Sequence, residues 1–292
     1  MHQGRGGWLS RAGDQVGCHA RVPCQGSRVR EYRAGLIRVT WKTQVMAGLE
    51  HKAALVTGGS RGIGRAIAER LAADGAAVVF SYLSNADAAA DVVAGITAAG
   101  GTAHAVQADL ADPGAGRRLF DQAESQLGPL DILVNNAGVV AGDPIADTTD
   151  EVFDTVLSVN LKSPFVLIRE AARRLRDDGR VVNISTLNTV MVGPGMAPYA
   201  ASKAALELLG RVAAYELGGR GITVNAVLPG ATDTELFRAN NPEESRKSLT
   251  ALTALGRIGQ PGDVADVVAF LASDDARWLT GQCIRAAGGL LA

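Results

Sequence analysis

Tyr199 and Lys203 are the two residues whose types and spacing could do chemistry most directly. They stand four positions apart in the sequence YAASK, so on a helix their side chains share one face. A neighbouring ammonium favours the phenolate and lowers the pKa of a tyrosine, which makes the phenol a proton donor or acceptor near neutral pH. Exposed Tyr–Lys pairs are also common on helices without a function, so the pair needs support from other motifs.

A second stretch, AALVTGGSRGIGRAIAERL at residues 53–71, predicts a site for a phosphate-bearing ligand. Its first apolar residues read as a buried strand, and the later ones recur at helical spacing. The turn between them carries Gly58, Gly59, Gly62 and Gly64. Residues without a Cβ let backbone N–H groups at a helix N-terminus approach a pyrophosphate, although glycines also serve tight packing of a strand on a helix. The turn therefore predicts a dinucleotide as ligand.

Strands and helices that alternate along the whole chain must position these residues. The expected strands begin at Lys52 and then span 77–82, 102–108, 130–135, 180–184, 223–228 and 282–285. The expected helices follow the glycine turn and then span 86–99, 113–127, 149–176 despite Pro164, 199–217 and 264–271. This alternation predicts a Rossmann-type α/β fold, a doubly wound parallel sheet in a single domain. Ligands of such sheets bind at the carboxyl ends of the strands.

Composition sets the class of protein. The 292 residues are 47% hydrophobic and 20% charged with a net charge of -1, so the chain can bury a large core and has no general attraction to nucleic acid or anionic lipid. We find no apolar run of the roughly 18 to 20 residues that a membrane helix needs. Cys18, Cys24 and Cys283 form neither a disulfide framework nor a metal-ligand spacing. We expect a reducing, cytoplasmic location and no metal.

Residues 1–45 differ from the rest of the chain. They carry eight Lys or Arg against two acids, a net charge of +6, and no sustained periodicity. We expect a disordered basic extension that adds nothing to the fold, followed by a dinucleotide-binding catalytic domain at residues 46–292. A transit peptide and a basic interaction tail are alternatives, and the tail could bind nucleic acid.

Five motifs in order give the chain its resemblance to a known family. They are TGGSRGIG, NNAG at residues 135–138, VNL at 159–161, YAASK, and NAVLPG at 225–230. From about Leu49 to Leu290 the chain resembles the short-chain dehydrogenase/reductase family. The closing segment at residues 255–282 looks most like the 3-oxoacyl-(acyl-carrier-protein) reductases and their polyketide and sugar-alcohol relatives.

The resemblance implies roles for four catalytic residues. Tyr199 would be the general acid toward a substrate carbonyl, Lys203 would lower its pKa and bind the nicotinamide ribose, and Asn160 would hold a proton-relay water. Asn160 could instead satisfy local backbone within its helix. The family's carbonyl-orienting serine lies thirteen positions before the tyrosine, where this chain has Thr186. Ser185 and Asn188 flank that position and could take its role.

The resemblance also implies a cofactor site. Asp109 would accept from the adenine amino group or else cap its own loop, and Asn136 would hold the adenosine side. The implied cofactor-binding residues are Gly58, Ser60, Arg61, Gly62, Ile63, Gly64, Ser84, Asp109, Leu110, Asn136, Ala137, Gly138, Tyr199, Lys203, Pro229, Gly230, Thr232 and Thr234. The second strand ends without an acid at 81–84, and Arg61 and Ser84 suit a 2′-phosphate, so NADP(H) is expected rather than NAD(H).

We therefore predict an NADP(H)-dependent oxidoreductase that transfers hydride between a nicotinamide and a ketone or secondary alcohol. A 3-oxoacyl thioester or polyketide-type carbonyl is a candidate substrate, and a non-catalytic NADP(H)-binding sensor or scaffold is the alternative. The segment 231–254 could cover the pocket as a lid, with Leu236, Phe237, Leu249 and Leu252 lining an acyl site or packing within the lid. By analogy with the family we expect a homotetramer or dimer, with Leu206, Leu209, Val212 and Ala213 offering apolar surface.

Overall fold

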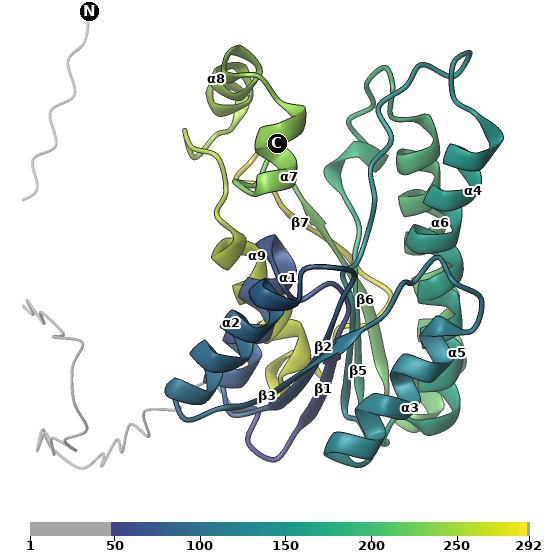
Figure 1. The fold of residues 1–292 in the computed structure, drawn as a ribbon, viewed down its shortest axis with the longest axis vertical. Coiled ribbons are helices and arrows are strands. Elements are labelled where there is room, and N and C mark those ends of the chain that lie inside the picture. The colour runs from purple at the N-terminus through teal and green to yellow at the C-terminus, as the bar shows by residue number, and fades with distance from the viewer. Residues whose placement is uncertain (1–47, 291–292) are drawn as a thin grey trace, which may run out of the picture. The chain divides into compact units, whose positions relative to one another are not determined.

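The computed structural model describes residues 48–290 (Figure 1), so the predicted basic extension at 1–45 lies outside the described residues. Seven parallel strands form one sheet in the order β3-β2-β1-β4-β5-β6-β7. They are β1 (Ala53–Val56), β2 (Ala77–Tyr82), β3 (Thr102–Gln107), β4 (Ile132–Asn135), β5 (Arg180–Ile184), β6 (Thr223–Pro229) and β7 (Cys283–Ala286). The predicted doubly wound, Rossmann-type α/β fold is confirmed.

Helices cover both faces of this sheet. The α-helices are α1 (Gly62–Ala73), α2 (Ala86–Ala98), α3 (Ala115–Leu127), α4 (Asp150–Leu157), α5 (Ser163–Arg174), α6 (Ala197–Leu217), α7 (Glu235–Asn240), α8 (Glu243–Leu252) and α9 (Pro261–Ala272). Figure 1 shows α1, α2 and α9 on one side of the sheet and α3, α5 and α6 on the other. Each side has its own buried apolar cluster, the first around Ile67 and Val268 and the second around Phe120 and Leu167. Both faces of the sheet are therefore buried at its centre, which explains why β1 and β4 are fully buried and mostly apolar, whereas the edge strand β3 alternates exposed and buried residues.

The strand order changes direction between β1 and β4. The chain runs outward from β1 through β2 to β3, and then returns to place β4 on the other side of β1. Val56 at the end of β1 pairs with Val134 near the end of β4. Loops that leave neighbouring strands in opposite directions open a crevice at this switch point. The glycine turn after β1 and the NNAG motif at the end of β4 consequently meet there.

Several boundaries differ from the sequence expectation. The helix expected over 149–176 is divided into α4, a π-helical segment η1 (Ser158–Lys162) and α5. Pro164 has no N–H to donate to the carbonyl of Asn160, so a regular α-helical ladder cannot continue through this point. The helix expected from Pro113 begins at Ala115, because Gly114 adopts a left-handed φ of 81°. β1 begins at Ala53 rather than Lys52, and β4 at Ile132 rather than residue 130.

Helix α6 packs more of its apolar residues on the sheet than expected. Leu206 is 0% exposed and Ala213 is 5% exposed, so the prediction that they offer surface to a neighbour is wrong for both. They lie on the inner face of α6, which packs on β5 and β6. Leu208, Val212 and Tyr215 lie on the outer face of α6 and are exposed instead. Among residues 48–290, no helix combines the length and apolarity that a membrane crossing requires.

Candidate active site

The four predicted catalytic residues come from three elements that end at the same edge of the sheet. Tyr199 and Lys203 lie on the first two turns of α6, Thr186 follows β5 directly, and Asn160 lies in η1. Pro198 is at the start of α6, where its missing N–H costs no helical hydrogen bond. Lys203 Nζ and Asn160 Oδ1 each lie 3.3 Å from the point where a Cβ on Gly138 would stand. Helix, strand end and π-turn thus bring these side chains to one place.

Tyr199 and Thr186 form the polar pair that faces the site. Burial raises the pKa of Tyr199, and the interaction of its hydroxyl with Thr186 lowers that pKa in part. Lys203 is 3% exposed, its Nζ donates to Ile184 O at 2.8 Å, and burial lowers its pKa to about 8. The pKa of Tyr199 is therefore raised in this structure, whereas the sequence led us to expect that Lys203 lowers it. The ammonium is occupied by the Ile184 carbonyl, and the phenol is partly withdrawn from water.

The three candidates for the second hydroxyl or amide lie in different surroundings. Ser185 Oγ donates to Glu207 Oε1 on α6 at 2.6 Å, away from Tyr199. Thr186 Oγ1 accepts from the backbone N–H of Asn188 at 3.2 Å and caps the short helix η2 (Leu187–Thr189). Asn188 contributes this N–H, and of the three side chains it is Thr186 that acts on Tyr199, where it lowers the pKa of the phenol. These contacts favour Thr186 as the partner of Tyr199.

Asn160 connects η1 to two other parts of the site. It is 0% exposed; its Oδ1 accepts from Val139 N at 2.9 Å, and its Nδ2 donates to Val139 O at 2.9 Å. The same amide nitrogen donates to Ser202 Oγ at 3.1 Å, and Ser202 Oγ donates to Tyr199 O at 2.7 Å. The Asn160 side chain thus forms hydrogen bonds with backbone groups, as the alternative expected. These groups belong to the loop after β4 and not to the helix of Asn160 itself. The Asn160 carbonyl lacks its usual donor because residue 164 is proline, which suits the predicted water.

The glycine turn fits a dinucleotide. The N-terminus of α1 has Arg61 at its cap position without a capping hydrogen bond from the side chain, and its first turn contains no acid. Its N–H groups and positive dipole end are therefore available to an anion. A Cβ on Gly64 would lie 2.1 Å from Gly58 O, so helix and turn approach as closely as only glycine allows. Gly58 has a φ of 69°, which a side chain would strain.

Asn136 holds this turn against β4. Its Nδ2 donates to Thr57 O at 2.8 Å and to Gly58 O at 3.1 Å. Thr57 Oγ1 in turn accepts from the backbone N–H groups of Asn136 and Ala137, each at 2.9 Å. The amide nitrogen thus fixes the pyrophosphate turn, and the predicted contact with adenosine stays a prediction.

The adenosine end of the predicted site is open. Arg61 and Ser84 are exposed, and Arg61 Nη1 lies 3.7 Å from Glu235 Oε2. Ser81, three residues before Ser84, is buried, and its Oγ accepts from Gly58 N at 3.1 Å. Asp109 Oδ1 accepts from Ala111 N at 2.9 Å, so its loop-capping role is present. No carboxylate stands at the end of β2, in agreement with the sequence.

The remaining predicted cofactor residues line the loops beside these. Ser60 and Ile63 flank the cap of α1, and Leu110 is a core residue, 9% exposed, beside Asp109. Thr232 Oγ1 donates to Gly230 O at 3.0 Å in the turn after Pro229. Thr234 Oγ1 accepts from Phe237 N at 3.1 Å and so caps α7.

Thr57, Ser81 and Ser202 take part in positioning the site, and the sequence reasoning missed them. All three make hydrogen bonds to residues that it did name. The signal available was their position inside or beside the motifs, since Thr57 opens TGGSRGIG and Ser202 precedes Lys203. Their partners are distant in sequence, by 79 residues for Thr57 and 42 for Ser202, so only the fold reveals them.

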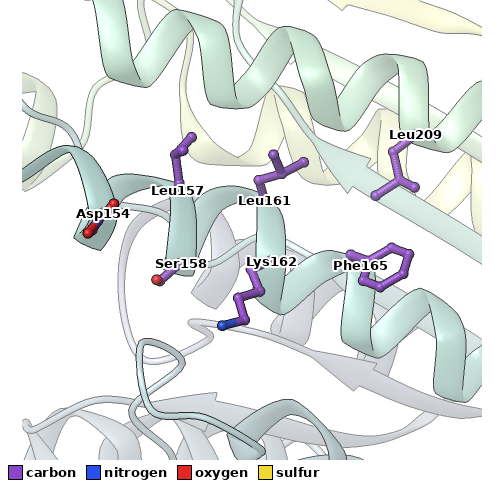
Figure 2. A pocket seen from close by; sticks show the side chains of 7 residues that line it. All are labelled: Asp154, Leu157, Ser158, Leu161, Lys162, Phe165 and Leu209. Carbon is purple, nitrogen blue, oxygen red and sulfur yellow. The ribbon is translucent and has the colours of Figure 1, made fainter.

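Two further cavities are lined by residues outside the predicted catalytic group. One, of about 550 Å³, is lined by parts of α7, α8 and residues 258–260, with Phe237 and Arg246 in its wall. Leu236 and Leu252 of the predicted lid are exposed on the same helices. The other, of about 730 Å³, is the α4–α6 groove, and Figure 2 shows its lining. The lining residues of the α4–α6 groove are Asp154, Leu157, Ser158, Leu161, Lys162, Phe165 and Leu209. None of them is a predicted catalytic residue.

Comparison with known proteins assigns this architecture to a family. A family model described as Enoyl-(Acyl carrier protein) reductase matches residues 58–291. An uncharacterized oxidoreductase of Methylorubrum extorquens is 46% identical over 84% of this chain and 100% of its own length. The 3-oxoacyl-[acyl-carrier-protein] reductase FabG of Staphylococcus aureus is 41% identical over 82% of this chain and 98% of its own. The crystal structure of the angucycline C-6 ketoreductase LanV with bound NADP is 45% identical, with a TM-score of 0.79, and the match covers 84% of this chain and 97% of that one.

Proposed function

Because the chain belongs to the short-chain dehydrogenase/reductase family, we propose that it is an NADP(H)-dependent ketoreductase that interconverts a ketone and a secondary alcohol. When bound, the nicotinamide supplies or accepts the hydride. The observation that carries the proposal is that Tyr199, Thr186, Lys203 and Asn160 come to the same edge of the sheet as the free N-terminus of α1. The non-catalytic alternative is not favoured, since the relatives are named reductases and the chain keeps all four of these side chains.

The side chains divide the work by their chemistry. Tyr199 would give a proton to the substrate oxygen during reduction and take it back during oxidation, because its phenol is the titratable hydroxyl of the pair. Thr186 would donate to the same oxygen and stabilise the charge that develops there. Lys203 would bind the ribose next to the nicotinamide, and once drawn from Ile184 O it would favour the phenolate of Tyr199. Asn160 would hold a water through its backbone carbonyl and so connect Lys203 to solvent.

The cofactor is assigned to NADP(H) from the charges at the end of β2. Arg61 is exposed at the cap of α1, and the segment 81–84 contains no carboxylate that would repel a 2′-phosphate. The solved relative LanV contains NADP. Gly58, Gly62 and Gly64 would receive the pyrophosphate, and Ser84 would bond the phosphate that distinguishes NADP from NAD.

For the substrate we propose a carbonyl on an extended apolar skeleton, such as a 3-oxoacyl thioester or a polyketide-type ketone. Ile145 and Val192 are 79% and 80% exposed in the loops that follow β4 and β5. These loops touch, since a Cβ on Gly195 would lie 2.5 Å from Gly142 O. Apolar side chains exposed above a catalytic pair are suited to an apolar ligand. The names of FabG and LanV support these two substrate classes.

A turnover screen tests the proposal. Purified protein is given NADPH or NADH with an acetoacetyl thioester, a quinone, an aromatic polyketide ketone, a sugar ketone, a steroid ketone and, for comparison, an enoyl thioester. We expect oxidation of NADPH with a thioester or polyketide ketone and little with the enoyl compound. Tyr199→Phe is the control and should lose turnover while it keeps NADPH binding. Binding of NADPH without turnover of any carbonyl would leave the sensor alternative instead.

We further propose that the protein forms a homodimer or tetramer through the α4–α6 groove and is cytoplasmic. The groove lies between Phe165 on α5 and Leu209 on α6, beside the exposed Leu208, Val212 and Tyr215. A second copy would cover this apolar surface by offering the same helices in return, as a two-fold interface requires. The cytoplasmic location rests on cysteine usage, with Cys283 a free thiol, and cell fractionation tests it.

A further inference from the structure

Glu207 is a buried acid that the chemistry above does not use. It lies on α6 one turn after Lys203 and is 8% exposed. Among the described residues, no cation lies within 4.0 Å of its carboxylate, whereas the comparably buried Glu170 pairs with Arg173 and Arg174. A buried carboxylate without a cation is costly unless hydrogen bonds hold it. Its surroundings should therefore show what it holds.

Ser185 and Cys283, from two strands of the sheet, lie at this carboxylate. Ser185 Oγ donates to Glu207 Oε1 at 2.6 Å. The thiol of Cys283 on β7 lies near Glu207, and its pKa is raised by burial and by this carboxylate, with Arg211 acting in the opposite direction. Glu207 thus connects α6 to the end of β5 and to the start of β7.

The contact with Ser185 belongs to a series. Three consecutive residues at the end of β5 each interact with a residue of α6. Ile184 O accepts from Lys203 Nζ at 2.8 Å and Ser185 Oγ donates to Glu207 Oε1 at 2.6 Å, while Thr186 lies near enough to the Tyr199 hydroxyl to lower the pKa of that phenol. Their α6 partners are spaced by four residues, so they lie along one face of the helix. Two of the three contacts hold predicted catalytic groups, and Glu207 anchors the residue between them.

We propose that Glu207 is a positioning residue, which through Ser185 fixes the end of β5 against α6 and so holds Thr186 on Tyr199. The inference rests on the proposed function, in which these two hydroxyls share the substrate oxygen. Loss of the anchor would let Ser185 rotate and would carry Thr186, its neighbour in the chain, away from the phenol. Small displacements of this kind lower kcat more than they change cofactor binding.

Four variants test the proposal by turnover. Glu207→Met removes the acceptor at similar length, Glu207→Gln keeps an amide oxygen that can still accept, and Ser185→Ala removes the donor. Glu170→Gln is the matched control, because it neutralises a buried glutamate on α5 outside the site. We expect kcat to fall about tenfold in Glu207→Met and Ser185→Ala, with recovery in Glu207→Gln and no loss in Glu170→Gln. The KM for NADPH should stay within about twofold of the wild type.

A second readout does not depend on turnover. The phenol of Tyr199 is titrated in protein labelled with ¹³C at tyrosine Cζ, with Tyr199→Phe used to assign its signal. Because Thr186 lowers the pKa of this phenol, loosening their contact in Glu207→Met and Ser185→Ala should raise that pKa above the wild-type value. The Ser185→Ala variant lacks only one oxygen atom, so it should fold even if Glu207→Met does not. The test then rests on Ser185→Ala.

The outcomes separate this inference from the proposed function. If Glu207→Met and Ser185→Ala lower only the melting temperature, with kcat and the Tyr199 titration as in the wild type, Glu207 is merely structural and the inference is wrong. If the wild type reduces no carbonyl but the titration moves as expected, the positioning role stands and the assigned reaction fails.

Discussion

At the level of single residues, Thr186 carries the most specific chemical expectation. Its side chain lowers the pKa of Tyr199, while Ser185 Oγ donates a hydrogen bond to Glu207. Thr186→Ala should lower kcat by about 10²-fold, the scale for the loss of one donor to a developing oxyanion. Thr186→Ser keeps the hydroxyl and should remain active, and Asn188→Ala should stay near the wild type. Steady-state kinetics of the three variants with one accepted ketone checks this, and an undiminished kcat in Thr186→Ala would reassign the donor.

Arg61 is the residue that we expect to set the preference for NADP(H) over NAD(H). Its side chain is 71% exposed at the cap of α1, and its exposed ion pair with Glu235 can be exchanged for a 2′-phosphate. Arg61→Ala should weaken NADPH binding about tenfold or more, the effect of losing a charge-assisted hydrogen bond, and leave NADH binding unchanged. Arg65→Ala is the control, since Arg65 is exposed one turn later and pairs with Glu69. Fluorescence titration measures both affinities, and equal losses for NADPH and NADH would contradict the assignment.

Lys203 makes stability depend on pH in the cofactor-free protein. Burial lowers its pKa to about 8, so above pH 8 the folded protein binds fewer protons than the unfolded chain. The buried ammonium therefore opposes folding below pH 8, and this cost is relieved as the pH rises toward about 10. The Lys203→Met variant has no such charge. Its free energy of unfolding at pH 7 should therefore exceed that of the wild type, by at most about 3 kcal/mol.

Urea unfolding of both proteins at a series of pH values checks this. The difference in the free energy of unfolding should shrink between pH 8 and 9.5, because the wild type gains stability there and the variant does not. A difference that stays constant across this range would show that Lys203 does not change its protonation.

At the level of elements, the strand–turn–helix unit of β1 and α1 depends on the absence of one carbon atom. Because a Cβ on Gly64 would lie 2.1 Å from Gly58 O, Gly64→Ala must push α1 away from the turn. We expect NADPH affinity to fall by at least about tenfold and the melting temperature to drop. Gly95→Ala in α2 is the matched control, since no atom lies within 4 Å of its Cβ position, and it should be neutral or stabilising. Retained NADPH affinity in Gly64→Ala would exclude the turn as the phosphate site.

The π-helical segment shows a second way in which an element positions chemistry. Pro164 interrupts the α-helical hydrogen-bond pattern between α4 and α5. The helix continues there through the π-helical segment η1 instead of ending. The extra residue of the π-turn directs Asn160 toward Val139 and Ser202, which belong to the loop after β4 and to α6. A local backbone irregularity thus joins two segments of the site.

At the level of the whole molecule, the α4–α6 groove predicts association. Val212 is 48% exposed on the outer face of α6, next to Leu208 and Tyr215. A charge at this position would be buried without a partner in a two-fold interface. The Val212→Glu variant should therefore dissociate, and the molar mass of the particle in solution should fall toward that of a single chain. Leu252→Glu on α8 is the control, because Leu252 is 65% exposed away from the groove. Light scattering at micromolar concentration checks both variants, and a monomeric wild type would refute the interface.

By itself the sequence determined the fold class and the places where the site would form. Apolar runs with the spacing of strands or of helices predicted the alternating elements. Short motifs placed the glycine turn and NNAG at strand ends and Tyr199 and Lys203 on one face of a helix. These features depend on residues within about four positions of one another, which pattern and turn chemistry describe well. The resemblance to the family followed from the same local motifs, and the comparisons bear it out.

Tertiary structure alone decided which polar groups meet. The pairing of Ser185 with Glu207, of Asn160 with Ser202 and of Thr57 with Asn136 joins residues 22, 42 and 79 positions apart. It also decided that Lys203 Nζ turns to Ile184 O and that Leu206 faces the sheet. The direction of a pKa shift follows burial and partners, and the exposure of an apolar residue follows the layer that its helix covers. The spacing of neighbouring residues predicts neither the pKa shift nor the exposure, because both depend on which distant strands lie beneath α6.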